Sequence, residues 1–424
     1  MQLKLALLAC AVATAGAAAT TATPLPTDEH GDYNAADIIE WIRSKDDGII
    51  HESLRVGRER PGDPTSINGL FVKSDAKAIE EGEVIANIPW DCIISSGKKY
   101  SYRKFESCSA IYKLADELRK GEESTKAPYV RYLLNLPRGT MPGEWNNAEK
   151  DFLSKVLGDD QLPPYEEDWR YGFERHWIND CEGDETDEME RAAYFLTQSR
   201  DEDTLMVPLY DMMNHSNDPV KLNTLSYKPR RAGDIFSVVA SKRIEPGEQV
   251  YNSYNRCSKC GIEVYGVDPD NCETFSHYGT PDIFRLFGFI EDYPQSWVFD
   301  TVDSSDDEVP NELDFCMMKD PNIDGEINVY WREEGVDDED IAWIEKQLKR
   351  LRELLSQKDK LEKELVQSEE EGEGDDKKIR RAQWETIWRY HGALVTALKL
   401  SSEASWLDSS DDDDDENNSG KDEL

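Results

Sequence analysis

The chain alternates between two kinds of local pattern, and this alternation limits the folds that it can adopt. Short apolar stretches separated by turns occupy residues 67–89 and return over residues 205–254, which predicts small β-strands with tight connections. Residues 100–197 lie between them and have a mostly helical pattern broken at prolines. A helical pattern returns from Asp337 onward. The order is therefore β-rich, helical, β-rich, helical, and the chain is long enough for two or three domains.

Individual elements can be assigned within this order. We expect a helix at residues 35–43, after a flexible lead-in over residues 23–34. Asp337 and Asp340 form a capping pair that predicts the start of another helix. Its apolar residues recur at helical spacing opposite a charged face, which indicates a packing face rather than a ligand site. These residues are Ile341, Ile344, Leu348, Leu351 and Leu355. A further helix is expected over residues 379–400.

The two ends of the chain predict a cellular location. A basic start, Met1–Lys4, precedes the apolar run Leu5–Val12, and small residues follow at 13–19. This pattern is typical of a signal peptide, because the apolar run is too short for an uncleaved membrane anchor. The last four residues are Lys-Asp-Glu-Leu, the signal read by the KDEL receptor. The expected location is therefore the endoplasmic reticulum lumen, with no membrane span.

The formal net charge of −40 excludes one class of partner. A nucleic-acid phosphate backbone requires a basic footprint, which this chain lacks. Much of the charge lies in two runs, residues 369–376 and 411–416, which are expected to be solvated and disordered. Solubility is the favoured role of these runs. Weak calcium binding and attraction of a basic protein partner are the alternatives.

Seven of the eight cysteines remain once the signal peptide with Cys10 is removed. They are Cys92, Cys108, Cys181, Cys257, Cys260, Cys272 and Cys316. An oxidising lumen favours disulfides, and an odd number leaves at least one thiol free or paired with another chain. The Cys257-x-x-Cys260 pair is compatible with zinc, but no clear fourth ligand lies near Cys272, so a disulfide is favoured and no metal is predicted. A thiol–disulfide oxidoreductase is disfavoured because a thioredoxin-like βαβ context is missing.

Two motifs in the second β-rich region carry the chemistry. Residues 205–216 read Leu-Met-Val-Pro-Leu-Tyr-Asp-Met-Met-Asn-His-Ser, and residues 245–254 read Glu-Pro-Gly-Glu-Gln-Val-Tyr-Asn-Ser-Tyr. Together they resemble the two halves of the SET-domain core, most closely in the Rubisco large-subunit methyltransferase-like branch. Further motifs in the order of that branch extend the resemblance over roughly residues 36–400. They are Asn68–Phe71 with Gly82-Glu83, Pro128–Pro137, Ser199-Arg200 and Thr280–Phe289.

The resemblance implies a divided architecture. In that branch a helical insert splits the SET domain and a helical lobe follows it, so an α+β SET core with an α-helical C-terminal lobe is expected here. The implied segments are a signal peptide at 1–22, the N-terminal part of the core at 36–95, the helical insert at 96–197, the C-terminal part of the core at 198–295 with a cysteine-containing insertion at 256–278, a helical substrate-binding lobe at 296–405, and an acidic tail with KDEL at 406–424.

The resemblance also implies a reaction, the transfer of a methyl group from S-adenosylmethionine to a nitrogen of another protein. Such a displacement must align the nitrogen lone pair with the bond from sulfur to methyl, which avoids several kcal/mol of entropy loss. The intrinsic pKa of a lysine is about 10.4, and a narrow dry channel lowers it by disfavouring the ammonium form. Aromatic walls exclude water and tolerate cationic methyl groups.

Roles carried over from the family fall on the matching positions. Tyr254 would be the catalytic tyrosine, with its hydroxyl near the transferred methyl and the acceptor nitrogen. The implied cofactor-binding residues are Gly69, Leu70, Arg200, Asp211, Asn214, His215, Tyr254, Phe287 and Phe289. Asn214 and His215 would act largely through backbone and amide contacts, and Arg200 and Asp211 would support the methionine end. Phe287 and Phe289 would flank the adenine or close the channel, although both are equally compatible with a place in the core.

The acceptor is expected to be a lysine of a basic protein, with histidine as the alternative, and the enzyme is expected to be a monomer. A non-catalytic lumenal binding protein on a SET scaffold is the rival interpretation. Ser216-Asn217 follows the Asn-His pair where many histone-modifying relatives carry a zinc-binding cysteine, so that cluster cannot form in that way. Asn214-His215-Ser216 is also a formal glycosylation sequon, which we expect to stay unmodified because it folds inside.

Overall fold

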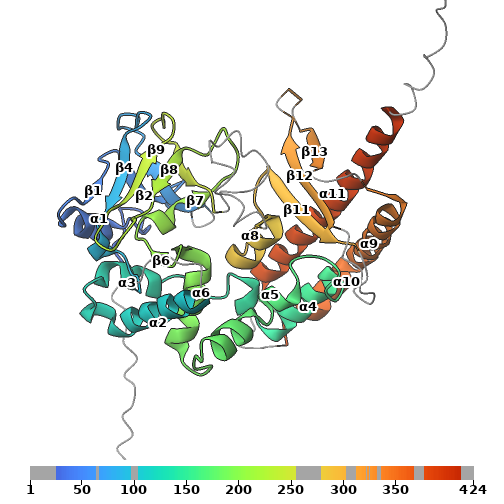
Figure 1. The fold of residues 1–424 in the computed structure, drawn as a ribbon, viewed down its shortest axis with the longest axis horizontal. Helices are drawn as coiled ribbons and strands as arrows, with labels where there is room; N and C mark the ends of the chain where they lie inside the picture. Colours follow the sequence, from blue (N-terminus) through green and yellow to red (C-terminus); the bar gives the residue numbers. More distant parts are fainter. Residues whose placement is uncertain are drawn as a thin grey trace, which may run out of the picture.

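The computed structural model describes residues 25–63, 66–96, 104–254, 278–301, 312–320, 322–323, 325–331, 336–366 and 377–411. Two four-stranded sheets form the first half of the molecule (Figure 1). One has the order β1-β4-β9-β8 and the other the order β2-β3-β10-β7. Their strands are β1 (Ile49–Ile50), β2 (Leu54–Arg58), β3 (Asn68–Val72), β4 (Val84–Ile88), β7 (Asn214–His215), β8 (Thr224–Tyr227), β9 (Phe236–Ala240) and β10 (Gln249–Asn252). The α+β class expected from the sequence is confirmed.

Strands far apart in the sequence meet in the second sheet, and this pairing builds the site. β10 pairs antiparallel with β3, with Val250 opposite Leu70. It also pairs in parallel with β7, with Tyr251 opposite Asn214 and Asn252 opposite His215. The two motifs expected to form the core are therefore hydrogen-bonded neighbours. The segment that follows Asn252 leaves the sheet beside His215.

Helices pack below the two sheets in Figure 1 and divide between two hydrophobic cores. The helices between the two halves of the sheets are α2 (Lys104–Lys120), α3 (Ala127–Leu134), α4 (Asn147–Leu157), α5 (Glu166–Trp169), a π-helix (Phe173–Asp180) and α6 (Glu188–Arg200), which leads into the small hairpin β5 (Asp201–Glu202) and β6 (Leu205–Met206). Buried residues of α2, α3 and α6 join the core of the sheets together with α1 (Ala36–Arg43). Those of α4 and α5 belong to a second core with the C-terminal lobe.

The C-terminal lobe contains a sheet that the sequence interpretation missed. An antiparallel sheet of β11 (Gln295–Asp300), β12 (Glu312–Lys319) and β13 (Ile327–Trp331) precedes its helices. The helices are α9 (Asp338–Ser356), α10 (Lys358–Leu365) and α11 (Arg381–Asp411). The expectation of a helical lobe over residues 296–405 is thus wrong for its first part, where alternate strand residues such as Trp297, Phe299 and Phe315 fill the second core.

A buried ion pair joins α4 to the lobe. The side chain of Glu149 is fully buried and accepts hydrogen bonds from the Arg380 guanidinium at 2.8 Å and from the Arg380 backbone N–H at 3.0 Å. Nearby, the Gln383 amide donates to the carbonyl of Gly139 at 3.0 Å. The start of α11 therefore holds the loop that follows α3.

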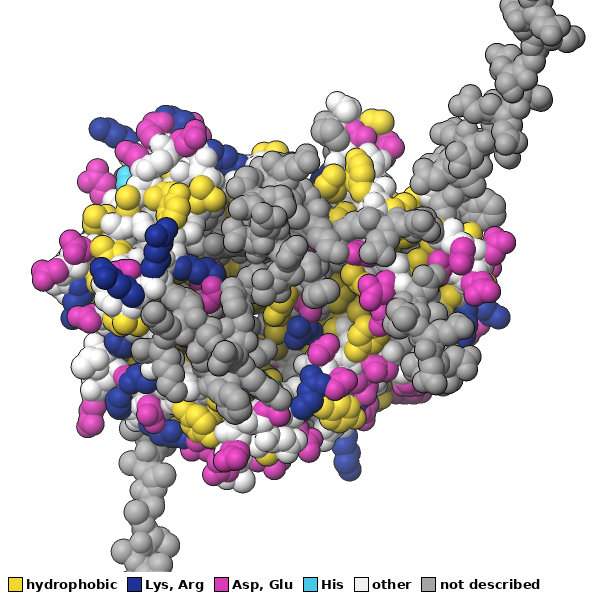
Figure 2. Space-filling model, in the orientation of Figure 1, with side chains coloured by type: hydrophobic (Ala, Val, Ile, Leu, Met, Phe, Trp, Pro, Cys, Tyr) yellow, Lys and Arg dark blue, Asp and Glu magenta, His cyan; other side chains and the backbone are white. Residues whose placement is uncertain are grey.

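The side chains on the face in Figure 2 carry both signs of charge. Lysine and arginine side chains there are interspersed with acidic ones rather than gathered in one stripe, which fits poorly with a phosphate backbone as partner. Among the described residues, no helix is both long and apolar enough to cross a membrane.

The capping pair expected at the start of α9 is confirmed. The Asp337 side chain accepts hydrogen bonds from the backbone N–H groups of Glu339 and Asp340, and the Asp340 carboxylate accepts one from the Asp337 backbone N–H. We expect Asp337→Ala to lower the free energy of unfolding by about 1 kcal/mol, because these helical N–H groups lose their partner. Chemical denaturation would measure this. Asp338→Ala, which removes an equal charge but no cap, is the matched control, and an equal loss in both variants would contradict the capping role.

Candidate active site

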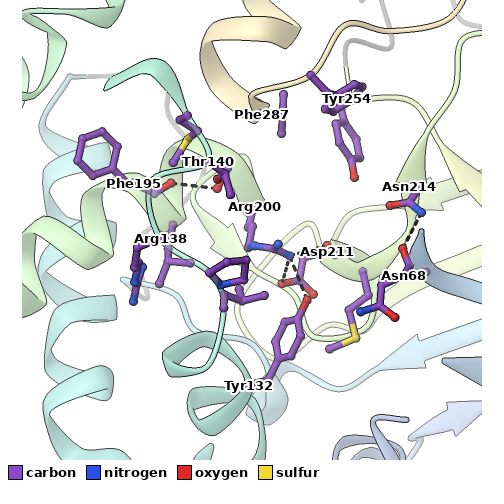
Figure 3. A pocket seen from close by; sticks show the side chains of 18 of the residues that line it. Asn68, Tyr132, Arg138, Thr140, Phe195, Arg200, Asp211, Asn214, Tyr254 and Phe287 are labelled. Atoms are coloured by element: carbon purple, nitrogen blue, oxygen red, sulfur yellow. Dashed lines mark hydrogen bonds and ion pairs between the residues drawn. The ribbon is translucent and has the colours of Figure 1, made fainter. Parts of the chain in front are cut away.

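A cavity of about 350 Å³ opens where the sheets, the insert and the end of α8 (Thr280–Phe287) meet (Figure 3). Seven residues selected from the sequence line it. They are Gly69, Arg200, Asp211, Asn214, Tyr254, Phe287 and Phe289. These residues lie up to 220 positions apart in the sequence. The pairing of β10 with both β3 and β7 brings the motifs that contain them together.

Tyr254 forms one wall of the cavity, and its phenol points inward in Figure 3. The hydroxyl donates a hydrogen bond to the carbonyl oxygen of Met213 at 2.7 Å. Burial raises the pKa of Tyr254 to about 12, so the phenol keeps its proton at neutral pH. Because that proton is committed to Met213, the lone pairs of the phenol oxygen are available to a group in the cavity.

Asn214 and Gly69 bring two strands close together on the opposite side. The Asn214 amide donates to the carbonyl of Asn68 at 2.7 Å. A Cβ atom on Gly69 would lie 2.8 Å from the Asn214 amide nitrogen and 2.5 Å from that of Gln249. A side chain at position 69 would therefore displace the amides beside the cavity, which explains why glycine occupies this position.

Arg200 and Asp211 form a polar floor with two tyrosines from the insert. One guanidinium nitrogen of Arg200 lies 3.5 Å from Asp211 Oδ2, 3.0 Å from the Asp211 carbonyl oxygen and 3.2 Å from the Tyr132 hydroxyl. The Tyr129 hydroxyl donates to Asp211 Oδ2 at 3.0 Å. The other carboxylate oxygen, Oδ1, is buried and has no hydrogen-bond partner among the described residues. Burial raises the pKa of Asp211 to about 6, although the Arg200 guanidinium opposes the shift.

Aromatic rings close the cavity above this floor. The ring centroid of Tyr254 lies 4.5 Å from that of Phe287 and 6.4 Å from that of Phe289. Between the two phenylalanines, Gly288 ends α8 in the left-handed region with a φ of 76°, where a Cβ would lie 2.1 Å from the carbonyl oxygen of Thr140. This tight turn lets the α8 end touch the loop after α3, so the two segments enclose the cavity together.

Two of the selected residues do not line the cavity. Leu70 is 1% exposed and packs in the core of the sheets. The imidazole of His215 is 2% exposed and lies between the Glu291 carboxylate and the backbone N–H of Tyr254. Both side chains therefore support the cavity from behind. The cysteine-containing insertion at residues 256–278 lies almost entirely outside the described residues, as do Cys257, Cys260 and Cys272.

Sequence reasoning missed several residues that line the cavity. Tyr132 belongs to the Pro128–Pro137 motif, so the motif itself pointed to it, whereas Arg138, Glu144 and Phe195 carried no such signal. Tyr33 lies in the stretch expected to be a flexible lead-in, which is a correction. Its ring stacks on that of Tyr132 with centroids 5.3 Å apart, and this contact holds the segment against the cavity.

The described residues contain no group of three or more His, Cys, Asp or Glu side chains arranged to hold a metal ion. The polar groups that line the cavity include the protonated phenol of Tyr254, the Arg200 guanidinium and the Asn214 amide.

A comparison with known protein families finds a match over part of the chain. Residues 69–255 match the family model of the SET domain. A search of curated proteins found no match. Two solved structures resemble the chain. The SET domain of LSMT bound to lysine and AdoHcy is 14% identical, with a TM-score of 0.45, and the match covers 88% of this chain and 92% of that one. Rubisco LSMT bound to sinefungin and monomethyllysine is 15% identical, with a TM-score of 0.45, and the match covers 89% of this chain and 92% of that one.

Proposed function

Since the chain contains a SET domain over residues 69–255, we propose that it is an S-adenosylmethionine-dependent protein methyltransferase that acts on lysine. The observation that carries the proposal is the cavity itself. Tyr254, Asn214 and the Arg200–Asp211 pair face one space under an aromatic wall, although they come from separate motifs.

The residues present fit a zwitterionic, cationic cofactor. Arg200 offers a guanidinium to a carboxylate, and the fully buried Asp211 side chain holds that guanidinium in place. Gly69 also lines the cavity, beside the Asn214 amide. When bound, S-adenosylmethionine would supply an electrophilic methyl group on a sulfonium.

The aromatic wall suits an uncharged amine acceptor. A lysine must lose its proton before its nitrogen can attack, and the aromatic surface of Tyr254, Phe287 and Phe289 disfavours the ammonium form. Tyr254 remains protonated, so its role is to orient the amine and not to remove the proton. The phenol oxygen can accept a hydrogen bond from the amine, which would aim the nitrogen lone pair along the cavity.

The Asp211 carboxylate gives a testable pH dependence of cofactor binding. With a pKa raised to about 6, it is charged at pH 7 and becomes protonated as the pH falls towards 5. We expect the Kd for S-adenosylmethionine to rise over this range, because the Arg200 guanidinium, which would hold the carboxylate of the cofactor, loses its anionic partner. Asp211→Asn should weaken binding by about 10- to 100-fold at pH 7, the loss of one charge-assisted hydrogen bond, and should remove the dependence on pH.

Isothermal titration calorimetry at pH 5, 6 and 7 would measure both effects. The matched control is Asp234→Asn, which removes a carboxylate that pairs with the exposed Arg231 outside the cavity. Wild-type affinity that stays constant from pH 7 to pH 5 would contradict this role of Asp211.

The choice between lysine and histidine as acceptor requires a product assay. Purified protein would be incubated with tritiated S-adenosylmethionine and a lumenal extract, and the labelled proteins would be hydrolysed to amino acids. We expect label in methyl-lysine. Label only in methyl-histidine would overturn lysine as the acceptor. Cofactor binding without transfer to any protein would favour the rival interpretation, a non-catalytic binding protein.

We also infer that the chain matures in an oxidising compartment, in keeping with the signal peptide and KDEL end expected from the sequence. Cys108 and Cys181 form a disulfide, and Cys316 is also disulfide-bonded. Cys92 is a free thiol, buried in the core of the sheets, where burial raises its pKa to about 11 and keeps it unreactive. Disulfides of this kind persist in the lumen and are rare in the cytosol, which supports the expected location.

A further inference from the structure

Glu291 is a buried carboxylate that belongs to none of the motifs and lies just after the aromatic turn of α8. The residue is 4% exposed. Its Oε2 lies 2.8 Å from His215 Nε2 and accepts a hydrogen bond from the Asn217 amide at 3.0 Å, and its Oε1 accepts one from the Thr280 hydroxyl at 2.7 Å. Each partner is a neutral group with a proton to donate, so the site selects an acceptor-only side chain.

The hydrogen bonds of His215 fix the position of its proton. Its Nδ1 accepts the backbone N–H of Tyr254 at 3.0 Å, so Nδ1 carries no proton. The neutral imidazole must then carry its proton on Nε2, and this N–H donates to Glu291. The three groups form a relay in which the Glu291 carboxylate fixes the imidazole and the imidazole holds the backbone of Tyr254.

This relay holds the chain on both sides of residues 255–277, the stretch outside the described residues. Tyr254 precedes that stretch, and Thr280 begins α8 after it. Glu291 is linked to Tyr254 through His215 and accepts a hydrogen bond from Thr280 directly. The Ser253 hydroxyl also donates a hydrogen bond to the Asn217 side chain at 2.7 Å. The ends of the stretch are thus tied to one carboxylate, whatever path the chain follows between them.

We propose that Glu291 is a positioning residue for the transfer reaction: it fixes the tautomer and orientation of His215, which anchors the Tyr254 backbone and so aims the phenol into the cavity. The inference rests on the proposed function. The phenol reaches the carbonyl of Met213 only from this backbone position, and Met213 directly precedes the Asn214-His215 strand. Loss of the relay would therefore loosen the phenol and leave the Arg200–Asp211 floor, on the far side of the cavity, unchanged.

Glu291→Gln is the most conservative test, because it keeps the size of the side chain. Its amide oxygen can face His215 and Asn217, but its NH₂ group must then face the Thr280 hydroxyl in place of an acceptor. We expect kcat to fall by about 10-fold with an unchanged Kd for S-adenosylmethionine, since His215 then donates to a neutral amide oxygen in place of a carboxylate. In a Tyr254→Phe background the same change should have little further effect on kcat, because both residues act through one phenol.

A structural role alone gives a different result. It would lower the melting temperature and reduce kcat by the same factor with or without the Tyr254 hydroxyl, and that outcome, or an unchanged kcat in Glu291→Gln, would overturn the proposal. Two substitutions of His215 separate the halves of the relay. His215→Asn keeps an acceptor for the Tyr254 N–H, and His215→Gln keeps a donor to Glu291. The asparagine variant should retain more kcat, and the reverse order would count against the relay.

Nitrogen-15 NMR of the histidine side chains tests the relay without any transfer assay. The His215 signals, identified by their loss in His215→Asn, should show a neutral imidazole protonated on Nε2 in the wild type. In Glu291→Gln the Nε2 proton should lose the shift that comes from a carboxylate partner. A His215 protonated on Nδ1 would disprove the relay. Absence of transferase activity, with the expected NMR result, would instead reject the proposed function and leave the relay intact.

Discussion

Replacing Tyr254 with phenylalanine should lower kcat for methyl transfer by about 10²- to 10³-fold, the cost of removing one positioned polar group at a reacting centre. The phenol is protonated, with a pKa raised to about 12, and its proton is held by Met213. Its oxygen is therefore the acceptor in the cavity wall that can orient the amine, and phenylalanine lacks that oxygen. Single-turnover kinetics with tritiated cofactor would measure the loss, and calorimetry should show a nearly unchanged Kd for S-adenosylmethionine.

Tyr251, which lies on β10 three residues before Tyr254, offers a matched control. Its hydroxyl has no hydrogen-bond partner among the described residues and does not line the cavity, so Tyr251→Phe should leave kcat within about twofold of the wild type. Similar losses in both variants would indicate damage to the strand. A wild-type kcat in Tyr254→Phe would show that the phenol hydroxyl plays no part in the transfer.

Replacing both Cys108 and Cys181 with serine should lower the free energy of unfolding by about 4 kcal/mol. The disulfide links positions 73 residues apart, and closing a loop of that length removes a large amount of entropy from the unfolded chain. It also joins α2 to the segment after the π-helix, beside the buried Trp177. Denaturation with and without a reductant would measure the effect: the wild type should lose stability on reduction, and the double variant should lose much less.

Cys92→Ala is the control for this pair, because Cys92 is buried and free. It should keep the full response to reductant and lose only the contacts of one small side chain. A double variant as stable as the wild type would show that the disulfide adds nothing to the fold. It would also weaken the inference of an oxidising compartment.

The site residues that the sequence predicted are those that lie within short contiguous motifs. Asn214 and Tyr254 were selected because the motifs that contain them resemble those of the SET-domain core, and the pairing of β7 with β10 makes neighbours of the two motifs. Glu291 gave no such signal. Its donors His215 and Asn217 lie 76 and 74 positions away, and a single glutamate after Phe-Gly-Phe-Ile is indistinguishable in sequence from a surface residue.

The fold was predicted where local patterns decide it and missed where distant packing does. The capping pair at Asp337 and Asp340 is local, and α9 begins as expected. The strands of the C-terminal lobe do show alternation, as in Gln295–Asp300, but the resemblance assigned helices to that region and the local pattern was overlooked. The division of the insert between two cores depends on contacts of Phe152 with Trp384 and Trp388 in α11, which no spacing in the sequence reveals.

The hydrogen bond between Asn214 and Asn68 has a consequence for how the chain must be made. The side-chain nitrogen of Asn214 is the atom that would carry the sugar in a glycosylation sequon. That amide donates a hydrogen bond to the carbonyl of Asn68, 146 residues earlier, beside a cavity of about 350 Å³. An oligosaccharide on that nitrogen would leave no room for a small-molecule ligand. In a chain that enters the secretory pathway, strand assembly and the sugar-transferring machinery therefore compete for the same nitrogen, and only molecules in which assembly finishes first can have a usable cavity.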